Sequence, residues 1–161
     1  MDLDTLSDTL NTVTTLEALR RLKYRYLRTL DLKQWDDFAD TLAPDVQASY
    51  GPNLRFDGRD AVVDFMRNSL PPAIITVHHC HHPELEVDGD TATGTWYLQD
   101  TVLVTEHRMQ LRGAAFYDDT YTRSADGAWR ISRTGYVRSY ESVETLGDSW
   151  KLTANRWGAD R

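Results

Sequence analysis

Two stretches of the sequence carry the residue types best suited to acid/base chemistry. The first, Ile75–His82, holds four of the five histidines in the chain, and the second, Trp96–Asp100, has the pattern of a strand with a carboxylate at its end. Histidine exchanges a proton readily near neutral pH, and a neighbouring carboxylate fixes its tautomer and stabilises its charged form. A histidine and an aspartate on facing strands would therefore form a proton-transfer pair.

Asp100 is the most informative single position, because it lies on the strand face that is predicted to be buried. Alternate residues of a strand share a face. The residues that share the face of Asp100 are mostly apolar, namely Ala92, Gly94, Trp96, Leu98 and Val102. A carboxylate buried among them needs a hydrogen-bond donor. Two alternatives stay open: an aspartate exposed at a strand end, and an aspartate paired with an arginine.

His78 is the candidate donor to Asp100, and it shares a strand face with Thr76 and Cys80. A correctly placed acid or base of this kind contributes roughly 10²–10⁴ in rate. The alternative is a polar strand edge in which one histidine is buried and hydrogen-bonded. The spacing of the residues alone does not select His78 over its neighbours.

The same cluster allows a metal-site hypothesis, because His78, Cys80 and His82 alternate along one strand face and both residue types bind zinc and copper. Alternate strand residues lie roughly 6–7 Å apart, which is too far for one small ion unless the strand bulges. The sequence has neither a Cys-x-x-Cys nor a His-Glu-x-x-His motif. We therefore expect no metal and no other cofactor.

Four further side chains are candidates for a ligand site. Tyr26 lies in the apolar stripe of the first predicted helix, Asp31 ends that helix, and its carboxylate is there disfavoured by the helix dipole. Tyr50 closes a short strand, and Arg138 lies near the end of the last one. The Tyr26 hydroxyl could donate to a substrate carbonyl, Tyr50 could reach the cavity rim, and Arg138 could pair with Asp31 or bind an anionic group. A core tyrosine, a helix-end turn and a surface arginine are the simpler interpretations.

Three helices are predicted to position these residues. A capping box at Thr14–Glu17 indicates a first helix over 15–31, and residues 1–13 are expected to be flexible. A second helix is predicted over 34–42. A third begins at 57–60 and ends at a Pro-Pro pair.

Strands are predicted where the spacing of the apolar residues changes from the helical period to a period of two residues. They are predicted at 45–50, 74–81, 84–88, 91–104, 109–123 and 128–140. The pattern is that of the α+β class, with a strongly curved, mixed but mostly antiparallel sheet around the three helices. Such a sheet leaves a conical cavity at one end, where a ligand site would lie.

Length and composition fit one soluble domain over residues 1–161, with a net charge of −7. The absence of a long basic run argues against a nucleic-acid partner. No apolar stretch approaches a membrane span, and the first residues lack the basic start of a signal peptide. The single Cys80 cannot form an internal disulfide. We expect a cytoplasmic protein whose tail, 143–161, covers the pocket or a subunit interface.

Seven collinear motifs between Leu16 and Ser142 carry a family resemblance. They are Arg25–Asp36, Ser49–Tyr50, Ser69–Pro71, His78–Glu84, Thr91–Asp100, Gly113–Tyr117 and Thr134–Arg138. With these motifs the chain resembles the nuclear-transport-factor-2-like (NTF2-like) superfamily, and within it the SnoaL-like branch. The motifs are most similar to those of the bile-acid 7-alpha-dehydratases, and scytalone dehydratases and ketosteroid isomerases are more distant relatives.

The resemblance implies a cone-shaped α+β barrel and a cofactor-independent dehydratase. The substrate would be a hydroxylated steroid, a bile-acid-like compound or another polycyclic enone. By position in the motifs, Tyr26, His78 and Asp100 take the catalytic roles. Tyr26 would polarise the carbonyl, and His78, held by Asp100, would take the acidified proton and return it to the departing hydroxyl.

The resemblance also implies a substrate-binding group made of Asp31, Tyr50 and Arg138. It implies a homodimer or homotrimer that binds a small apolar polycyclic substrate, either free or conjugated to coenzyme A. Two other functions stay open on the same fold. One is a ketosteroid-type isomerase or polyketide cyclase, and the other is a ligand-binding module without catalytic activity.

Overall fold

The computed structural model describes residues 2–158, which form three α-helices and a six-stranded sheet. The helices are α1 (Leu3–Asp31), α2 (Trp35–Asp40) and α3 (Arg59–Ser69), and none of them is long and apolar enough to cross a membrane. The strands are β1 (Leu42–Ser49), β2 (Arg55–Asp57), β3 (Ile74–Asp88), β4 (Thr91–Val104), β5 (Met109–Arg123) and β6 (Trp129–Thr145). A 3-10 turn at Thr105–His107 links β4 to β5.

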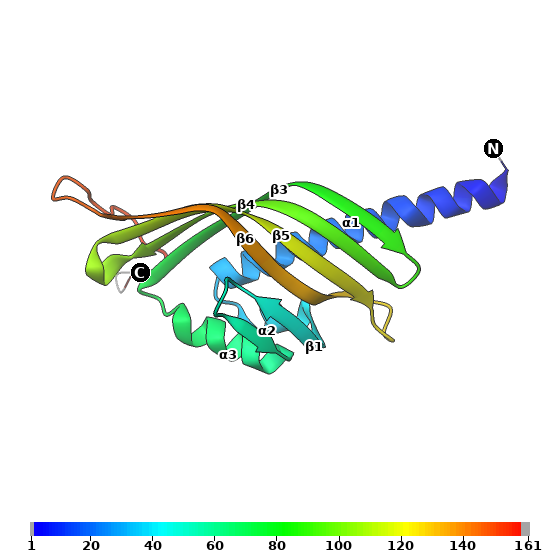
Figure 1. Ribbon diagram of the computed structural model, residues 1–161, viewed down its shortest axis with the longest axis horizontal. Helices are drawn as coiled ribbons and strands as arrows, with labels where there is room; N and C mark the ends of the chain where they lie inside the picture. The colour runs from blue at the N-terminus through cyan, green and yellow to red at the C-terminus, as the bar shows by residue number, and fades with distance from the viewer. Residues whose placement is uncertain (1, 159–161) are drawn as a thin grey trace.

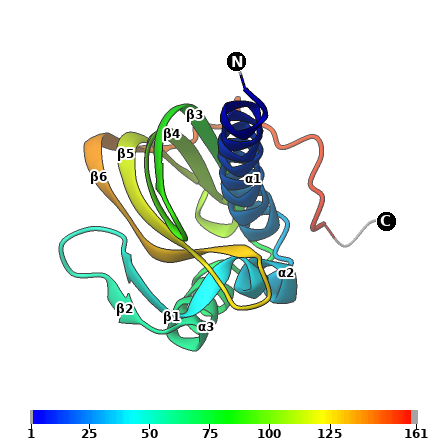
Figure 2. The same ribbon diagram turned by 90° about the vertical axis from the view of Figure 1, so that its right-hand side faces the viewer.

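The sheet order is β2-β1-β6-β5-β4-β3, and only the β1–β6 pair is parallel. The predicted α+β class with a mixed, mostly antiparallel sheet is confirmed. The long strands twist and curve, and α1 runs along their inner side (Figures 1 and 2). The edge strands β2 and β3 do not pair with each other, so the curved sheet stays open instead of closing into a barrel.

Helix α1 begins well before its predicted start. The Thr5 N–H donates to the Asp2 carboxylate at 2.8 Å, which caps a helix that starts at Leu3. The predicted capping box was therefore wrong, and Glu17 instead pairs with Arg21 at 2.9 Å. No glycine or proline interrupts the first turns after the cap, so the helix propagates into solvent where flexible chain was expected.

The C-terminal half of α1 packs against the sheet through its predicted apolar stripe. Leu19, Leu22, Tyr26 and Leu30 are all buried there. Residues three or four apart share one face of a helix, so this stripe determines which side of α1 meets the strands. The same packing brings Asp31, the last residue of α1, against β3.

The boundaries between α2 and β1 differ from the prediction. The helix ends at Asp40 and the strand begins at Leu42, so Pro44 lies inside the strand and not before it. The pairing of β1 with β6 is irregular between Leu42 and Gln47, and Pro44, which has no N–H, is tolerated in that gap. The short strand β2 was not predicted, because three residues carry too little pattern.

Strand β3 is one long strand where two were predicted. Its pairing with β4 shifts between His81 and Glu84, and His82 there has a positive φ of 46°. A bulge of this kind interrupts the alternation without ending the strand, so β3 continues to Asp88. Strand β6 also runs further than predicted, to Thr145.

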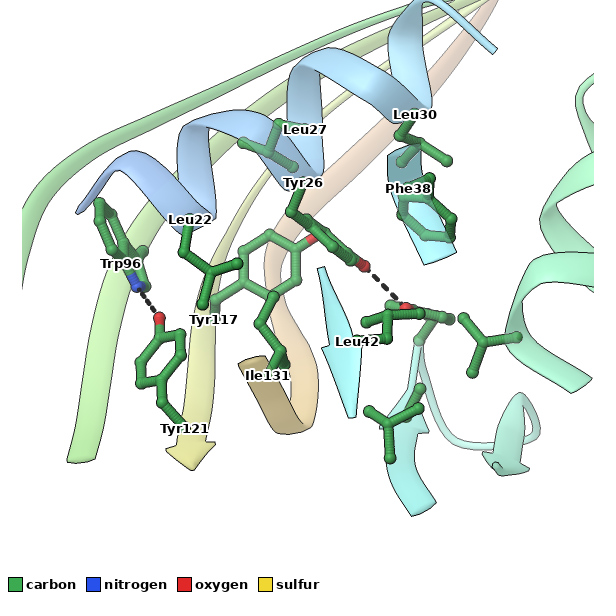
Figure 3. Packing of buried hydrophobic residues seen from close by; sticks show 14 of the residues in the cluster. Leu22, Tyr26, Leu27, Leu30, Phe38, Leu42, Trp96, Tyr117, Tyr121 and Ile131 are labelled. Atoms are coloured by element: carbon green, nitrogen blue, oxygen red, sulfur yellow. Dashed lines mark hydrogen bonds between the residues drawn. The ribbon is translucent and has the colours of Figure 1, made fainter. Parts of the chain in front are cut away.

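The inner side of the curved sheet also holds a buried polar network. Trp96 Nε1 donates to the Tyr121 hydroxyl at 2.8 Å (Figure 3), and that hydroxyl donates to Asp119 at 2.8 Å. Thr134 donates to the other carboxylate oxygen of Asp119 at 2.7 Å, and Lys23 Nζ lies 2.7 Å from the first. The side chains of Lys23 and Asp119 are both 0% exposed, so this pair is sealed between α1 and the sheet.

The chain after β6 turns back toward the C-terminal end of α1. Leu146 is buried, and its carbonyl oxygen accepts a hydrogen bond from Arg108. Lys33 Nζ lies 5.6 Å from the centre of the Trp157 ring. No tail residue within the described part of the chain lines the main cavity. That the tail covers the pocket or a subunit interface stays a prediction.

Candidate active site

A cavity of about 560 Å³ lies on the inner side of the sheet, between α3, the end of α1 and the long strands. Its apolar wall is formed by Leu30, Pro52, Leu54, Phe65, Met66, Leu70, Val102 and Leu111. Its polar lining is formed by Tyr50, Thr76, His78, Asp100, Tyr117, Tyr136, Arg138 and Glu141. An apolar wall with a few converging polar groups is typical of a small-molecule site.

His78 and Asp31 form a close pair at the edge of this cavity. The His78 Nδ1 atom lies 2.6 Å from Asp31 Oδ1. Because an ionised carboxylate only accepts hydrogen bonds, Nδ1 carries the proton and Nε2 keeps its lone pair. The His78 backbone N–H and the Thr76 hydroxyl also donate to Asp31, at 2.9 Å and 2.7 Å. Three contacts therefore hold Asp31, and Asp31 holds the imidazole in one tautomer.

The predicted partner of His78 was wrong, although the predicted strand positions were right. His78 and Asp100 are direct cross-strand neighbours on β3 and β4. Side chains of such neighbours project side by side from one face of a sheet, so both enter the cavity without meeting end to end. Asp31 instead approaches from the helix that crosses this face, where its carboxylate can meet the imidazole directly.

Asp100 and Arg138 form a second pair in the cavity. Of the alternatives open for Asp100, the structure thus shows the aspartate that is paired with an arginine. Both terminal guanidinium nitrogens donate to the carboxylate, Nη2 at 2.8 Å, and Nε lies 3.2 Å from Glu141. These hydrogen bonds raise the pKa of Arg138 above its ordinary value. Gly113 makes the pair possible, because a Cβ there would collide with the guanidinium. The predicted contact of Arg138 with Asp31 is absent, since its donors are engaged by other carboxylates.

Tyr26 lies behind the cavity wall, and Tyr50 lies on it. The Tyr26 side chain, labelled in Figure 3, is fully buried, and its hydroxyl lies 2.7 Å from that of Tyr50. Tyr50 lines the cavity. Burial raises the pKa of both phenols, so both keep their protons. When Tyr26 donates to Tyr50, the Tyr50 proton is free to point into the cavity.

The sequence pattern assigned no role to Tyr117 and Glu141, which line the cavity, or to Gly113, which leaves room for the Arg138 guanidinium. Gly113 and Tyr117 share the inner face of β5 by simple alternation, but the sequence pattern of that strand did not show which face was buried. Asp100 pairs with Gly113 across β4 and β5, so Gly113 and every second residue from it lie on the inner face. This register would have identified that face. Glu141 was missed because it follows the predicted end of the last strand.

The remaining histidines lie away from the cavity. His79, His81 and His82 are exposed, whereas Cys80 is half-buried and points inward with His78. Burial raises the pKa of the Cys80 thiol to about 11. The histidine-rich stretch is thus divided between two faces of β3. Within residues 2–158, no three His, Cys, Asp or Glu side chains are arranged to hold a metal ion.

Several solved structures share the fold. A hexachlorocyclohexane dehydrochlorinase, LinA type 2, aligns with a TM-score of 0.77 at 22% identity, over 84% of this chain and 93% of that one. A candidate scytalone dehydratase from Novosphingobium aromaticivorans aligns with a TM-score of 0.76 at 21% identity, over 91% and 95%. ActVI-ORFA from Streptomyces coelicolor aligns with a TM-score of 0.67 at 16% identity, over 78% and 98%.

Identities this low show a common fold and do not assign a substrate. The finer resemblance to bile-acid 7-alpha-dehydratases stays a prediction. A family model described as a SnoaL-like domain matches residues 11–135, which include most of α1, all of α2 and α3, and most of the sheet. The family match and the shared α+β architecture together show that the chain belongs to the SnoaL-like domain family of the NTF2-like superfamily.

Proposed function

We propose that this protein is a cofactor-free dehydratase that removes water from a hydroxylated, uncharged polycyclic enone, such as a steroid or a bile-acid-like ring system. His78, held by Asp31, is the acid/base group, and a phenol of the cavity polarises the carbonyl. The observation that carries the proposal is the 2.6 Å contact between His78 Nδ1 and Asp31 Oδ1 beside a cavity with an apolar wall.

The exposure of this pair suits proton transfer. The His78 and Asp31 side chains are 13% and 20% exposed, so the imidazole is neither sealed in the core nor free in water. Apolar walls exclude water and strengthen the electrostatic interactions within the cavity. A base positioned in this way contributes roughly 10²–10⁴ in rate.

The charges of the lining favour an uncharged ring system. The donors of Arg138 are engaged by Asp100 and Glu141, so this cation is not free to bind a carboxylate. An anionic group inside the cavity would also face Asp31 and two other carboxylates. The carboxylate or coenzyme A part of a conjugated substrate would therefore extend out of the cavity. The volume lies within the range of roughly 300–1,000 Å³ that is common for small-molecule sites.

The elimination balances without an external reagent. His78 Nε2 takes a proton from a carbon that the carbonyl acidifies through its conjugated double bond, while the Tyr50 hydroxyl, supported by Tyr26, donates to the carbonyl oxygen. The electron pair of the broken C–H bond forms a new C=C bond, and the C–O bond to the hydroxyl breaks. The imidazolium protonates the departing oxygen, water leaves, and His78 returns to the tautomer that Asp31 holds.

The test is to incubate the purified protein with a panel of hydroxylated 3-oxo-4-ene steroids and to follow dienone absorbance and the loss of water by mass. His78→Ala should lower kcat roughly 10²–10⁴-fold. His79→Ala is the matched control, because His79 is exposed on the other face of β3, and it should keep the wild-type rate. No turnover by the wild type across the panel would refute the proposal, and so would an unchanged rate in His78→Ala.

Two other functions would use the same cavity, and each leaves a different signature. An isomerase or cyclase needs the same acid/base pair, and a double-bond shift leaves the substrate mass unchanged where dehydration lowers it. A non-catalytic ligand-binding protein would hold a steroid tightly without exchanging its acidic protons for solvent deuterium.

A further inference from the structure

We propose that Tyr117 is a catalytic residue that donates a second hydrogen bond to the substrate carbonyl oxygen, and that Lys23 tunes this donor from behind its ring. The proposal rests on the proposed function for the chemical class of the ligand. It adds to that function two residues to which the sequence pattern assigned no role, Tyr117 on β5 and Lys23 on α1.

Tyr117 is a rigidly held phenol with an unused hydroxyl. It lines the cavity, yet only 2% of it is exposed. Within residues 2–158 its hydroxyl has no hydrogen-bond partner, whereas the Tyr50 hydroxyl is engaged by Tyr26. Burial raises the pKa of Tyr117 well above its ordinary value, so the phenol keeps its proton and acts as a donor and not as a base. A fixed donor of this kind stabilises charge that develops on a substrate oxygen.

The rings of Tyr50 and Tyr117 approach the same part of the cavity. Both pack against Tyr136, with ring centres 5.9 Å and 5.4 Å apart, respectively. All three residues line the cavity. Two phenols that converge on one region, one from the residue that follows β1 and one from β5, are placed to share one acceptor oxygen.

Lys23 lies against the face of the Tyr117 ring. Its Nζ atom is 3.4 Å from the ring centre, and the side chain is fully buried. On its other side Nζ is 2.7 Å from Asp119, a close ion pair whose geometry is not that of an aligned hydrogen bond. Asp119 is itself held by Tyr121 and Thr134, so the ammonium cannot move away from the ring.

A cation on the face of a phenol ring makes its hydroxyl a stronger hydrogen-bond donor, because it withdraws electron density from the ring. This gives the buried Lys23–Asp119 pair a role beyond joining α1 to the sheet. The ammonium cannot reach the substrate itself, since Lys23 does not line the cavity. It is therefore a positioning residue that acts through Tyr117.

The sheet register indicates how far the acid/base group lies from the second carbonyl donor, and therefore which substrates fit. His78, Asp100 and Gly113 are paired across β3, β4 and β5 in one row. Tyr117 is four residues further along β5, which is about 13 Å at the backbone. The polarised carbonyl and the departing hydroxyl would thus lie at separate places on the substrate, joined by a conjugated system. This arrangement favours a multi-ring enone over a small hydroxyketone.

The experiment uses 4-androsten-3-one, a 3-oxo-4-ene steroid with no hydroxyl group to lose, bound to the full-length protein. The infrared C=O stretch of the bound probe reports each donated hydrogen bond without any turnover. Tyr117→Phe keeps the ring and its contact with Lys23, and should shift the stretch back toward its value in an apolar solvent. In the steroid assay it should lower kcat about 10²-fold. Tyr97→Phe, on the outer side of the sheet, should change neither quantity.

Lys23 is tested with Lys23→Met/Asp119→Asn, which removes both charges together and avoids leaving a carboxylate unpaired in the core. Circular dichroism confirms that the variant is folded. It should shift the stretch in the same direction as Tyr117→Phe but by less, and should lower kcat about 2- to 30-fold.

The outcomes separate this inference from the proposed function. If no hydroxylated steroid is turned over but the carbonyl shift is lost in Tyr117→Phe, the dehydratase proposal fails and the donor role stands. If the wild type dehydrates steroids and Tyr117→Phe changes neither kcat nor the stretch, the donor role fails. Failure of the probe to bind, or an unshifted carbonyl in the wild-type complex, also overturns it. An unchanged stretch in the folded double variant removes the role of Lys23.

Discussion

Two pairs of ionisable side chains tie α1 to the sheet, and they have opposite environments. Lys23 and Asp119 are completely buried, and Tyr121 and Thr134 donate to the carboxylate from its other sides. Asp31 and His78 are 20% and 13% exposed at the edge of the cavity. Both pairs join a helix to a strand, but only the Asp31–His78 pair keeps a hydrogen-bonding atom, Nε2 of His78, that is free for a ligand.

The difference teaches how a buried pair and a reactive pair are distinguished. Burying two charges is costly, and the cost is offset only when every group is satisfied by the protein. The Lys23–Asp119 pair approaches that state, so its main effect is on stability. His78 uses Nδ1 to bind Asp31 and keeps Nε2 free, so its main effect is on the chemistry of whatever enters the cavity.

The largest expected effect separates activity from stability at the open pair. Asp31→Asn should lower kcat roughly 10²–10⁴-fold, because a neutral amide no longer stabilises the imidazolium. The melting temperature should change little, since the pair is partly exposed. Steroid kinetics and thermal unfolding measure the two quantities, with Asp8→Asn on the exposed part of α1 as the control. A normal kcat in Asp31→Asn would remove the contrast between the two pairs.

The Lys23–Asp119 pair should show its largest effect on stability. Asp119→Ala should lower the free energy of unfolding by about 3–5 kcal/mol, because it leaves the Lys23 ammonium unpaired in the core. Urea unfolding measures the change. Asp118→Ala, one residue earlier in β5 and exposed, should change the free energy by less than about 0.5 kcal/mol. If both variants behave alike, the burial argument is wrong.

The Asp100–Arg138 pair is intermediate in exposure between the other two pairs. A substitution at Gly113 tests how much this pair contributes to stability. Gly113→Ala should lower the free energy of unfolding by about 1–3 kcal/mol, because the new Cβ forces the guanidinium away from Asp100. Gly147→Ala is the control, since nothing lies within 4 Å of a Cβ there. Urea unfolding of both variants checks the prediction, and equal stabilities would show that the guanidinium has room to shift.

The smallest effect concerns the Cys80 thiol, which lies between the two pairs. Burial raises its pKa to about 11, so in the folded protein the unreactive thiol form persists at pH values where an ordinary cysteine already ionises. Reaction with a disulfide reagent should be slow at pH 8 and should accelerate only as the pH approaches 11. The urea-unfolded protein should react quickly at pH 8. Equal rates in the two states would contradict the raised pKa.

Much of the fold followed from short-range pattern. The inner face of β4, with Trp96, Leu98 and Asp100 buried in alternation, was predicted because a period of two needs only neighbouring residues. The buried stripe of α1 was predicted for the same kind of reason. Element boundaries were less predictable. An effective cap at Asp2 and a bulge at His82 each depend on one residue that the periodicity does not contain.

What the sequence by itself determined is therefore which side chains face inward. The α+β class and the inward direction of Asp100 are consequences of local alternation, as is the division of the histidine stretch between two strand faces. The family motifs added which of these residues to examine.

Only the tertiary structure decided which of those side chains touch. Asp31 meets His78 across 47 positions of the chain, and Arg138 meets Asp100 across 38. These contacts depend on where α1 crosses the sheet and on the register between distant strands, and no local period records either. For the same reason the sequence could place Tyr26 on the inner side of α1, but not behind another phenol.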